Sequence, residues 1–168
     1  AFWLEGAGCI FAENQAMRWL VSLTGLPDSA FGVFTSGGTE ANLSAMVAAR
    51  ENWRKQNENR KHQRGIVITA ISAHSSVRSM AKVIDVDVIS VQTEDKFEAH
   101  QLVETLNSLT PDEQSRVFAV IATGGTTNAG IIDDLEGIAE ICEKENLWFH
   151  VDAAYGGGAL AVKSVRKL

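Results

Sequence analysis

Several short segments of this sequence carry glycine and polar residues of the kinds that bind a small ligand. Residues 36–39 read Ser-Gly-Gly-Thr and lead into a helix-like run. A helix that begins there would offer backbone N–H groups, two hydroxyl groups and the positive end of its dipole, which together favour a phosphate. The segment matches neither a Walker loop nor the G-x-G-x-x-G fingerprint. Taken alone, it is equally compatible with a tight turn in which Thr39 is the helix N-cap.

His74 and Asp152 are the candidate proton-handling side chains. His74 directly follows an apolar run, and its imidazole could stack on a planar ligand or move a proton. Asp152 ends the apolar run "LWFHVD", where a carboxylate is partly desolvated and needs a cationic partner to stay ionised. For each residue the alternative is a capping or turn role without a ligand.

Hydroxyl and amide groups follow a further apolar run, at Thr126, Thr127 and Asn128, and a triple glycine at 156–158 allows a close backbone approach. One ligand would use all of these groups, because it has a phosphate, a flat aromatic ring and a ring nitrogen that needs a carboxylate. That ligand is pyridoxal 5′-phosphate, whose protonated ring nitrogen pairs with an aspartate. The residues therefore predict this cofactor, and they predict no metal site.

The elements that must position these groups alternate between strand and helix, after a first helix at 10–24. We expect strands at 33–36, 65–71, 86–91, 117–123 and 147–153, with helices between them. This alternation is typical of an α/β fold with a mostly parallel sheet and flanking helices. Ligands bind to such sheets outside the carboxyl ends of the strands. Because the candidate segments all follow predicted strands, we expect them to meet in one cleft there.

Composition narrows the function further. The chain has 168 residues, 45% of them hydrophobic and 21% charged, and a formal net charge of −6. The negative charge argues against a nucleic-acid or anionic-membrane surface, and no apolar run approaches the roughly 20 residues that span a bilayer. Two cysteines far apart in sequence favour reduced thiols and a cytoplasmic location. The first residue is not Met, and we expect the chain to be a piece of a longer protein.

Three longer segments carry a resemblance to a known family. They are "GVFTSGGTEANLSAMVAAR" (32–50), "SAHSSVRSMAKV" (72–83) and "IATGGTTNAGIIDDLEGIAEICEKENLWFHVDAAYGGG" (121–158), of which the last is the most specific. In these segments the chain resembles the group II pyridoxal-phosphate-dependent amino-acid decarboxylases, such as glutamate and aromatic-L-amino-acid decarboxylase. The resemblance implies decarboxylation of an L-amino acid to the amine and CO2 by a homodimer.

The same resemblance implies an aspartate-aminotransferase-like large domain of fold type I, which is incomplete in this chain. Residues 1–168 would form part of this cofactor-binding domain, with a helical lead-in at 1–30 and βα units at 31–168. The partner subunit's mobile loop and the small C-terminal domain would lie elsewhere.

The family's site residues carry over to matching positions. Gly38 and Thr39 match the phosphate-binding turn, and Thr127 matches a threonine beside the cofactor ring.

His74 matches the histidine that stacks on the ring and faces the substrate, and Asp152 matches the aspartate that pairs with the pyridine nitrogen. Ala154 matches the small residue against the other face of the ring. The family's Schiff-base lysine is expected beyond Leu168, in an Asp-Pro-His-Lys context. Lys163 and Lys167 lack that context, and we expect them to be surface lysines.

Alternatives remain open at this stage. Cysteine desulfurases and class V aminotransferases share the "TSGGTEAN"-like and "HSSV"-like stretches, whereas "GTTNAGIIDD" and "HVDAAYGGG" favour the decarboxylase. An inert fragment or a decarboxylase-like scaffold is the non-enzyme alternative. The substrate is also open among glutamate, aromatic amino acids, cysteine sulfinate and diaminobutyrate.

Overall fold

The computed structural model describes residues 4–164. The chain divides into two compact units, one made of residues up to 36 together with those from 157 onward, and the other of residues 37–156. The described elements are α1 (Ala7–Thr24), α2 (Gly38–Gln56), η1 (Glu58–Arg60), β1 (Ile66–Ala70), α3 (Ser75–Val83), β2 (Asp87–Val91), α4 (Ala99–Ser108), α5 (Pro111–Arg116), β3 (Val117–Thr123), α6 (Leu135–Lys144), β4 (Trp148–Asp152) and η2 (Gly156–Ala161).

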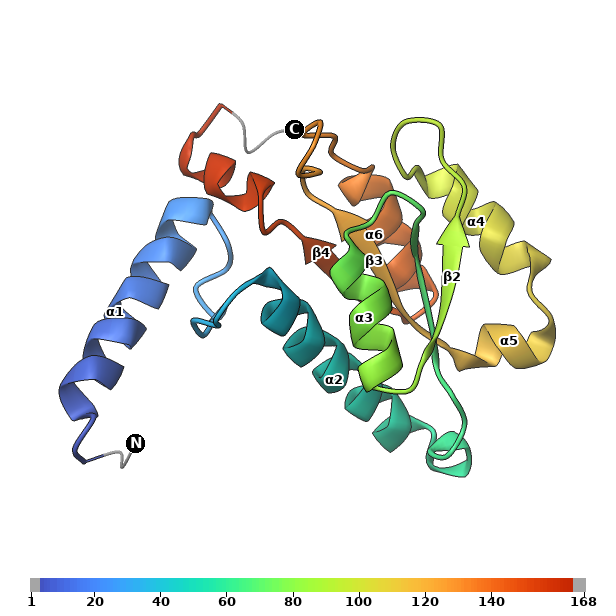
Figure 1. Ribbon diagram of the computed structural model, residues 1–168, viewed down its shortest axis with the longest axis horizontal. Helices are drawn as coiled ribbons and strands as arrows, with labels where there is room; N and C mark the ends of the chain where they lie inside the picture. Colours follow the sequence, from blue (N-terminus) through green and yellow to red (C-terminus); the bar gives the residue numbers. More distant parts are fainter. Residues whose placement is uncertain (1–3, 165–168) are drawn as a thin grey trace. The chain divides into compact units, whose positions relative to one another are not determined.

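A parallel sheet forms the centre of the second unit. Its four described strands lie in the order β2-β1-β3-β4 (Figure 1). The two inner strands, β1 and β3, are buried along their whole length, as expected for strands covered on both faces. The predicted α/β class with a parallel sheet and flanking helices is therefore confirmed.

Helices cover both faces of this sheet, and each face has its own apolar core. On one face Val67 of β1 packs with Met46 of α2 and Met80 of α3. On the other face Ile68 of β1 packs with Leu102 of α4 and Ile138 of α6. The alternation along β1 follows from the two-residue period of a strand, which sends successive side chains to opposite faces. This burial fixes the strand ends, and with them the segments that follow.

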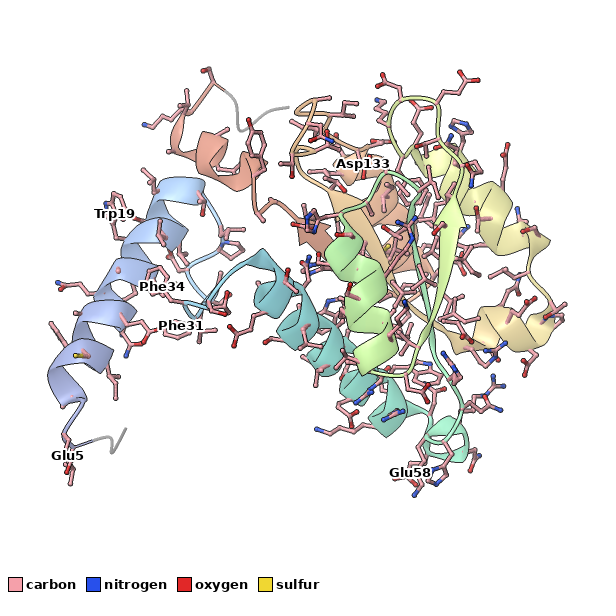
Figure 2. The ribbon with its side chains drawn as sticks, viewed as in Figure 1. Glu5, Trp19, Phe31, Phe34, Glu58 and Asp133 are labelled. Atoms are coloured by element: carbon pink, nitrogen blue, oxygen red, sulfur yellow. The ribbon has the colours of Figure 1, made fainter. Side chains whose placement is uncertain are left out.

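The first unit contains α1, which ends at Gly25 in the left-handed conformation (φ 75°) that favours glycine as a helix C-cap. The predicted strand at 33–36 is wrong, because these residues form no strand in the structure. An extended segment becomes a strand only by pairing with a neighbour, and here the Phe34 N–H instead donates to the Glu13 carboxylate of α1 (3.2 Å). The side chains of Trp19, Phe31 and Phe34 are about 60% exposed (Figure 2).

Local capping signals set two of the helix starts. Thr110 and Glu113 form a capping box with Pro111 at the first position of α5. Asp134 caps α6 by accepting a hydrogen bond from the Gly137 N–H (3.2 Å). In residues 4–164 no helix combines the length and hydropathy that crossing a bilayer requires.

Candidate active site

A cavity of about 600 Å³ opens where the strands of the second unit end. This volume lies within the range of about 300–1,000 Å³ that is typical of small-molecule sites. The cavity wall contains all the residues to which the sequence analysis assigned a role in binding or catalysis: Gly38, Thr39, His74, Thr127, Asp152 and Ala154. The fold thus brings together segments that are up to 116 residues apart in sequence, from Gly38 to Ala154.

The phosphate-binding turn predicted at 36–39 is the start of α2. The helix begins at Gly38, and its N-cap is Gly37, so Thr39 is inside the first turn and is not the N-cap. Because glycine has no side chain, no N-cap side chain covers the N–H groups of this turn. A Cβ added at Gly38 would lie 3.1 Å from the Cβ of Ala154, so a larger residue would crowd the cavity wall.

Asp152 supplies the carboxylate of the cavity. It is the last residue of β4 and lies beside Thr123, the last residue of β3. Its Oδ2 accepts a hydrogen bond from the amide nitrogen of Asn42 (2.8 Å), and its Oδ1 accepts one from the Ala154 N–H (3.2 Å). Both donors are neutral, so neither is the cationic partner that would balance the charge of a carboxylate. A protonated ring nitrogen is such a partner.

His74 has the capping role that was one of its two interpretations, and it also lies in the cavity wall, where the ligand-binding role stays a prediction. It is the N-cap of α3, and its Nδ1 accepts a hydrogen bond from the Ser76 N–H (3.2 Å). The ring is nevertheless exposed and lines the cavity. Capping therefore holds the imidazole at a fixed place without removing it from the site.

Three polar residues at the cavity were missed by the sequence analysis: Asn42 and Ser76, which line the cavity, and His150, which hydrogen-bonds to Asn42. Asn42 is buried and belongs to the same stripe of α2 as Met46 and Ala49. A polar residue on an apolar helix stripe is a signal that could have identified it. His150 is two residues before Asp152 on β4, and the two-residue period of a strand places both on one face.

The environment of His150 keeps its ring neutral. Burial lowers the pKa of His150, and the negative charge of Asp152 opposes this shift in part. The Nε2 atom lies 2.9 Å from the amide oxygen of Asn42. Because an amide oxygen can only accept, Nε2 carries the proton in this hydrogen bond.

The segment between β3 and α6 carries Thr127 and Asn128 into the cavity wall. Within this segment, the Thr126 Oγ1 accepts a hydrogen bond from the Ile131 N–H (3.1 Å), which links two of its residues directly. Where this segment joins β3 and α6, the buried Asp133 carboxylate accepts hydrogen bonds from the N–H groups of Phe97 (2.8 Å) and Thr123 (2.6 Å). Asp133 thus connects the end of β3 with the segment before α4.

Burial of Asp133 has an electrostatic cost. Desolvation raises the pKa of this carboxyl group, and the hydrogen bonds from Phe97 and Thr123, together with the charge of Lys96, offset that rise in part. The side chain is 5% exposed. Asp133 is thus a structural group at the base of the Thr127 segment.

The glycines at 156–158 were expected to let the backbone pass close to another group. For Gly156 that group is the backbone of another part of the chain. A Cβ added at Gly156 would overlap the carbonyl oxygen of Gly124, whereas a Cβ at Gly158 would meet nothing within 4 Å. Gly125 has a φ of 104°, a conformation that other residues rarely adopt. The chain after β4 therefore crosses directly over the chain after β3.

The predicted surface position of Lys163 agrees with its exposed side chain, and Lys167 lies outside the described residues. Among the described residues that line the cavity, none is a lysine. An amine for a Schiff base is therefore not provided by this part of the wall.

Comparisons with known proteins identify relatives of this chain. The family model of the pyridoxal-dependent decarboxylase conserved domain matches residues 3–168. An L-2,4-diaminobutyrate decarboxylase of Rhizobium meliloti is 36% identical over 163 residues, which cover 94% of this chain and 32% of that protein. An aromatic-L-amino-acid decarboxylase of Bacillus atrophaeus is 33% identical over 164 residues, covering 94% of this chain and 33% of that protein.

A solved structure leads to the same assignment. The crystal structure of mouse CSAD in apo form superposes with a TM-score of 0.83 at 31% identity, covering 94% of this chain and 35% of that one. The chain thus spans about a third of the length of these relatives. The resemblance drawn from the sequence, including fold type I, is confirmed. Since the family model covers nearly the whole sequence, the chain belongs to the pyridoxal-dependent decarboxylase family.

Proposed function

We propose that the full-length protein catalyses the pyridoxal-phosphate-dependent decarboxylation of an L-amino acid to the amine and CO2. The observation that carries the proposal is one cavity that combines the start of α2, the exposed imidazole of His74 and the carboxylate of Asp152. Family membership supports it as well. The chain would supply the phosphate-, ring- and nitrogen-binding parts of the site.

The phosphate would bind at the start of α2. Gly38 and Thr39 offer backbone N–H groups at the positive end of a 19-residue helix, and Thr39 adds a hydroxyl group. Thr127 adds a second exposed hydroxyl from the segment after β3. This set of neutral donors suits a phosphate dianion.

The cofactor ring would bind between the carboxyl end of β4 and the start of α3. When bound, pyridoxal phosphate supplies an aromatic ring that takes up the electron pair left at Cα as the carboxylate departs as CO2. Asp152 would hold the proton on the ring nitrogen, which keeps the ring electron-poor. His74 would cover one ring face and help to orient the substrate carboxylate, and Ala154 would leave room at the other face.

The rival chemistries are less well supported. A cysteine desulfurase or a class V aminotransferase could use the same phosphate turn, but the family match is to decarboxylases. The relatives also bear on the substrate, since their names cover aromatic amino acids, 2,4-diaminobutyrate and cysteine sulfinate. We keep these substrates, with glutamate, as candidates.

The test is a CO2-release assay on the full-length protein supplied with pyridoxal phosphate and each candidate amino acid in turn. We expect release of CO2 and an equal amount of the amine from at least one of them, and none without the cofactor. Release of sulfide, or amine exchange with a keto acid in place of CO2, would assign the protein to a rival class. A protein that binds no cofactor and converts none of the amino acids would be the inert scaffold.

We further propose a homodimer and a cytoplasmic location. Several apolar residues of the first unit are more than half exposed, among them Phe11, Trp19 and Phe31. Their exposure supports a protein–protein interface on this unit. The two cysteines, Cys9 and Cys142, are both free thiols, which supports a reducing compartment. Light scattering and cell fractionation of the full-length protein test these two proposals.

A further inference from the structure

Asn42 lines the cavity and is the residue at which several polar groups of its wall meet. It is 3% exposed. Its amide nitrogen donates hydrogen bonds to Asp152 Oδ2 (2.8 Å) and to Ser76 Oγ (3.1 Å), and its amide oxygen accepts one from His150 Nε2 (2.9 Å). One side chain on α2 thus connects α3 with β4, and both of its N–H groups and its oxygen are used.

The hydrogen bonds continue from Ser76 to His74 with a defined direction. Because Ser76 Oγ accepts from Asn42, its own O–H can donate to His74 Nδ1, which lies 2.9 Å away. The same Nδ1 also accepts from the Ser76 N–H. A ring nitrogen that accepts two hydrogen bonds carries no proton, so the neutral imidazole of His74 has its proton on Nε2.

We infer that Asn42 is a positioning residue that couples Asp152 to His74. The inference rests on the proposed function, in which these two side chains contact the cofactor. Through one N–H group Asn42 aligns the Asp152 carboxylate, and through the other it directs the Ser76 hydroxyl and so selects the tautomer of His74. An apolar residue in its place would fill the space but remove the hydrogen bonds that Asn42 makes to His150 Nε2 and Asp152 Oδ2.

A negative charge at position 42 should have a strong electrostatic effect, because the hydrogen-bond network around it contains titratable side chains. The titratable side chains joined by this network are Asp152 and His150 on β4 and His74 at the start of α3. Asn42→Asp would put a carboxylate oxygen in place of the donor nitrogen next to Asp152. Two carboxylates in contact cannot both ionise, so the pair would share a proton and titrate as a unit.

The experiment uses the full-length protein with Asn42→Ala, Asn42→Asp and Ser76→Ala. The matched control is Asn52→Asp, the same change on the same helix at an exposed position. Three quantities are measured: the tautomer of His74 from the 15N resonances of labelled histidine, assigned with His74→Gln; the pH dependence of the bound cofactor's absorbance; and kcat and KM. Circular dichroism reports whether each variant is folded.

We expect Asn42→Ala to lower kcat by about 10- to 100-fold while KM changes by less than about threefold, as for a lost alignment. Its His74 resonances should show a mixture of tautomers. Asn42→Asp should add a titration to the absorbance profile that neither the wild type nor Asn52→Asp has. A folded Asn42→Ala protein with the wild-type tautomer, absorbance profile and kcat would overturn the inference.

Ser76→Ala separates the two branches and covers the case in which the Asn42 variants do not fold. It removes only the branch to His74, so the tautomer should change while the absorbance profile stays that of the wild type. The wild-type tautomer in Ser76→Ala would overturn the coupling. Failure of the proposed function looks different, because the wild type would then release no CO2 while its His74 resonances still reported the network.

Discussion

The carboxylate of Asp133 accepts a hydrogen bond of 2.6 Å from the backbone N–H of Thr123, the last residue of β3. The same carboxylate accepts one from Phe97, so it joins the end of β3 to the segment before α4. Asp133→Asn removes one of the two acceptor oxygens and turns an N–H donor toward a backbone donor. We expect the free energy of unfolding to fall by about 1–3 kcal/mol at mildly acidic pH.

The pH dependence of this loss has a definite sign. Because burial raises the pKa of Asp133, the folded protein keeps the proton to a higher pH than the unfolded chain does. The wild type therefore loses part of its stability as the pH rises through the raised pKa, and the asparagine variant does not. The difference in urea unfolding between the two proteins should shrink from acidic to neutral pH. A difference that grows with pH, or an equal loss in the exposed Asp95→Asn control, would contradict this account.

Asp152→Asn in the full-length protein tests the partner of the ring nitrogen. The phosphate contacts at the start of α2 stay intact, but the anion that holds the ring proton is lost. We expect kcat to fall by at least about 100-fold, or roughly 3 kcal/mol, while the cofactor still binds. Glu143→Gln removes an exposed carboxylate of α6 and should leave turnover unchanged. Decarboxylation at near the wild-type rate by Asp152→Asn would refute the assignment.

Gly156→Ala tests the crossing of the chain over Gly124. The added methyl group would overlap the Gly124 carbonyl oxygen, so the backbone after β3 or β4 must shift. We expect a loss of about 1–3 kcal/mol in the free energy of unfolding, measured by denaturant titration. Gly158→Ala adds the same methyl group in open space and should change stability by less than about 0.5 kcal/mol. Equal effects of the two substitutions would show that the crossing is not tight.

The two cysteines should differ sharply in reactivity. Burial raises the pKa of Cys142 to about 12, so its thiolate is scarce and its sulfur is shielded, whereas Cys9 is exposed. Brief alkylation of the native protein should label Cys9 and leave Cys142 unmodified, and alkylation in denaturant should label both. Peptide mass spectrometry gives the two yields. Equal native labelling would mean that the α6 side of the core opens readily.

The 168 residues alone should release no CO2 from any candidate amino acid. The expected reason is that the Schiff-base lysine is not among them, as the cavity wall and the exposed Lys163 both indicate. A cofactor-supplemented assay on this chain, with its mass measured by light scattering, provides the test. CO2 release by a monomer of this chain would mean that Lys163 or Lys167 forms the covalent link.

The local pattern of apolar and polar residues was sufficient to predict most of the fold. The apolar, β-branched runs at 66–70 and 117–123 form strands within a residue or two of their predicted limits, because both strands are buried on both faces. The segment 33–36 has similar residues but finds no partner strand among the described residues, and pairing cannot be inferred from one segment alone. The short helix α5 is charged, and only its capping box indicates it.

The residues of the site likewise fall into two groups, those that the local sequence could identify and those that it could not. Gly38, His74 and Asp152 could be identified because each follows an apolar run and has a chemistry that suits a phosphate, a ring or a ring nitrogen. Asn42 could not be assigned a role, since its role depends on contacts to residues 34 and 110 positions away in the sequence. Such contacts are a product of the tertiary fold and leave no local periodicity.

The separation of 110 residues between Asn42 and Asp152 also bears on biosynthesis. A nascent chain that has emerged only as far as β3 already holds α2, α3 and three of the four described strands, but it lacks the carboxylate for the ring nitrogen. In the described sheet β4 is an edge strand that pairs only with β3, so it can join last without disturbing the strands already formed. In the proposed function, capture of the cofactor ring would therefore wait until translation has passed Asp152, and a ribosome stalled earlier would hold a chain that cannot retain the ring.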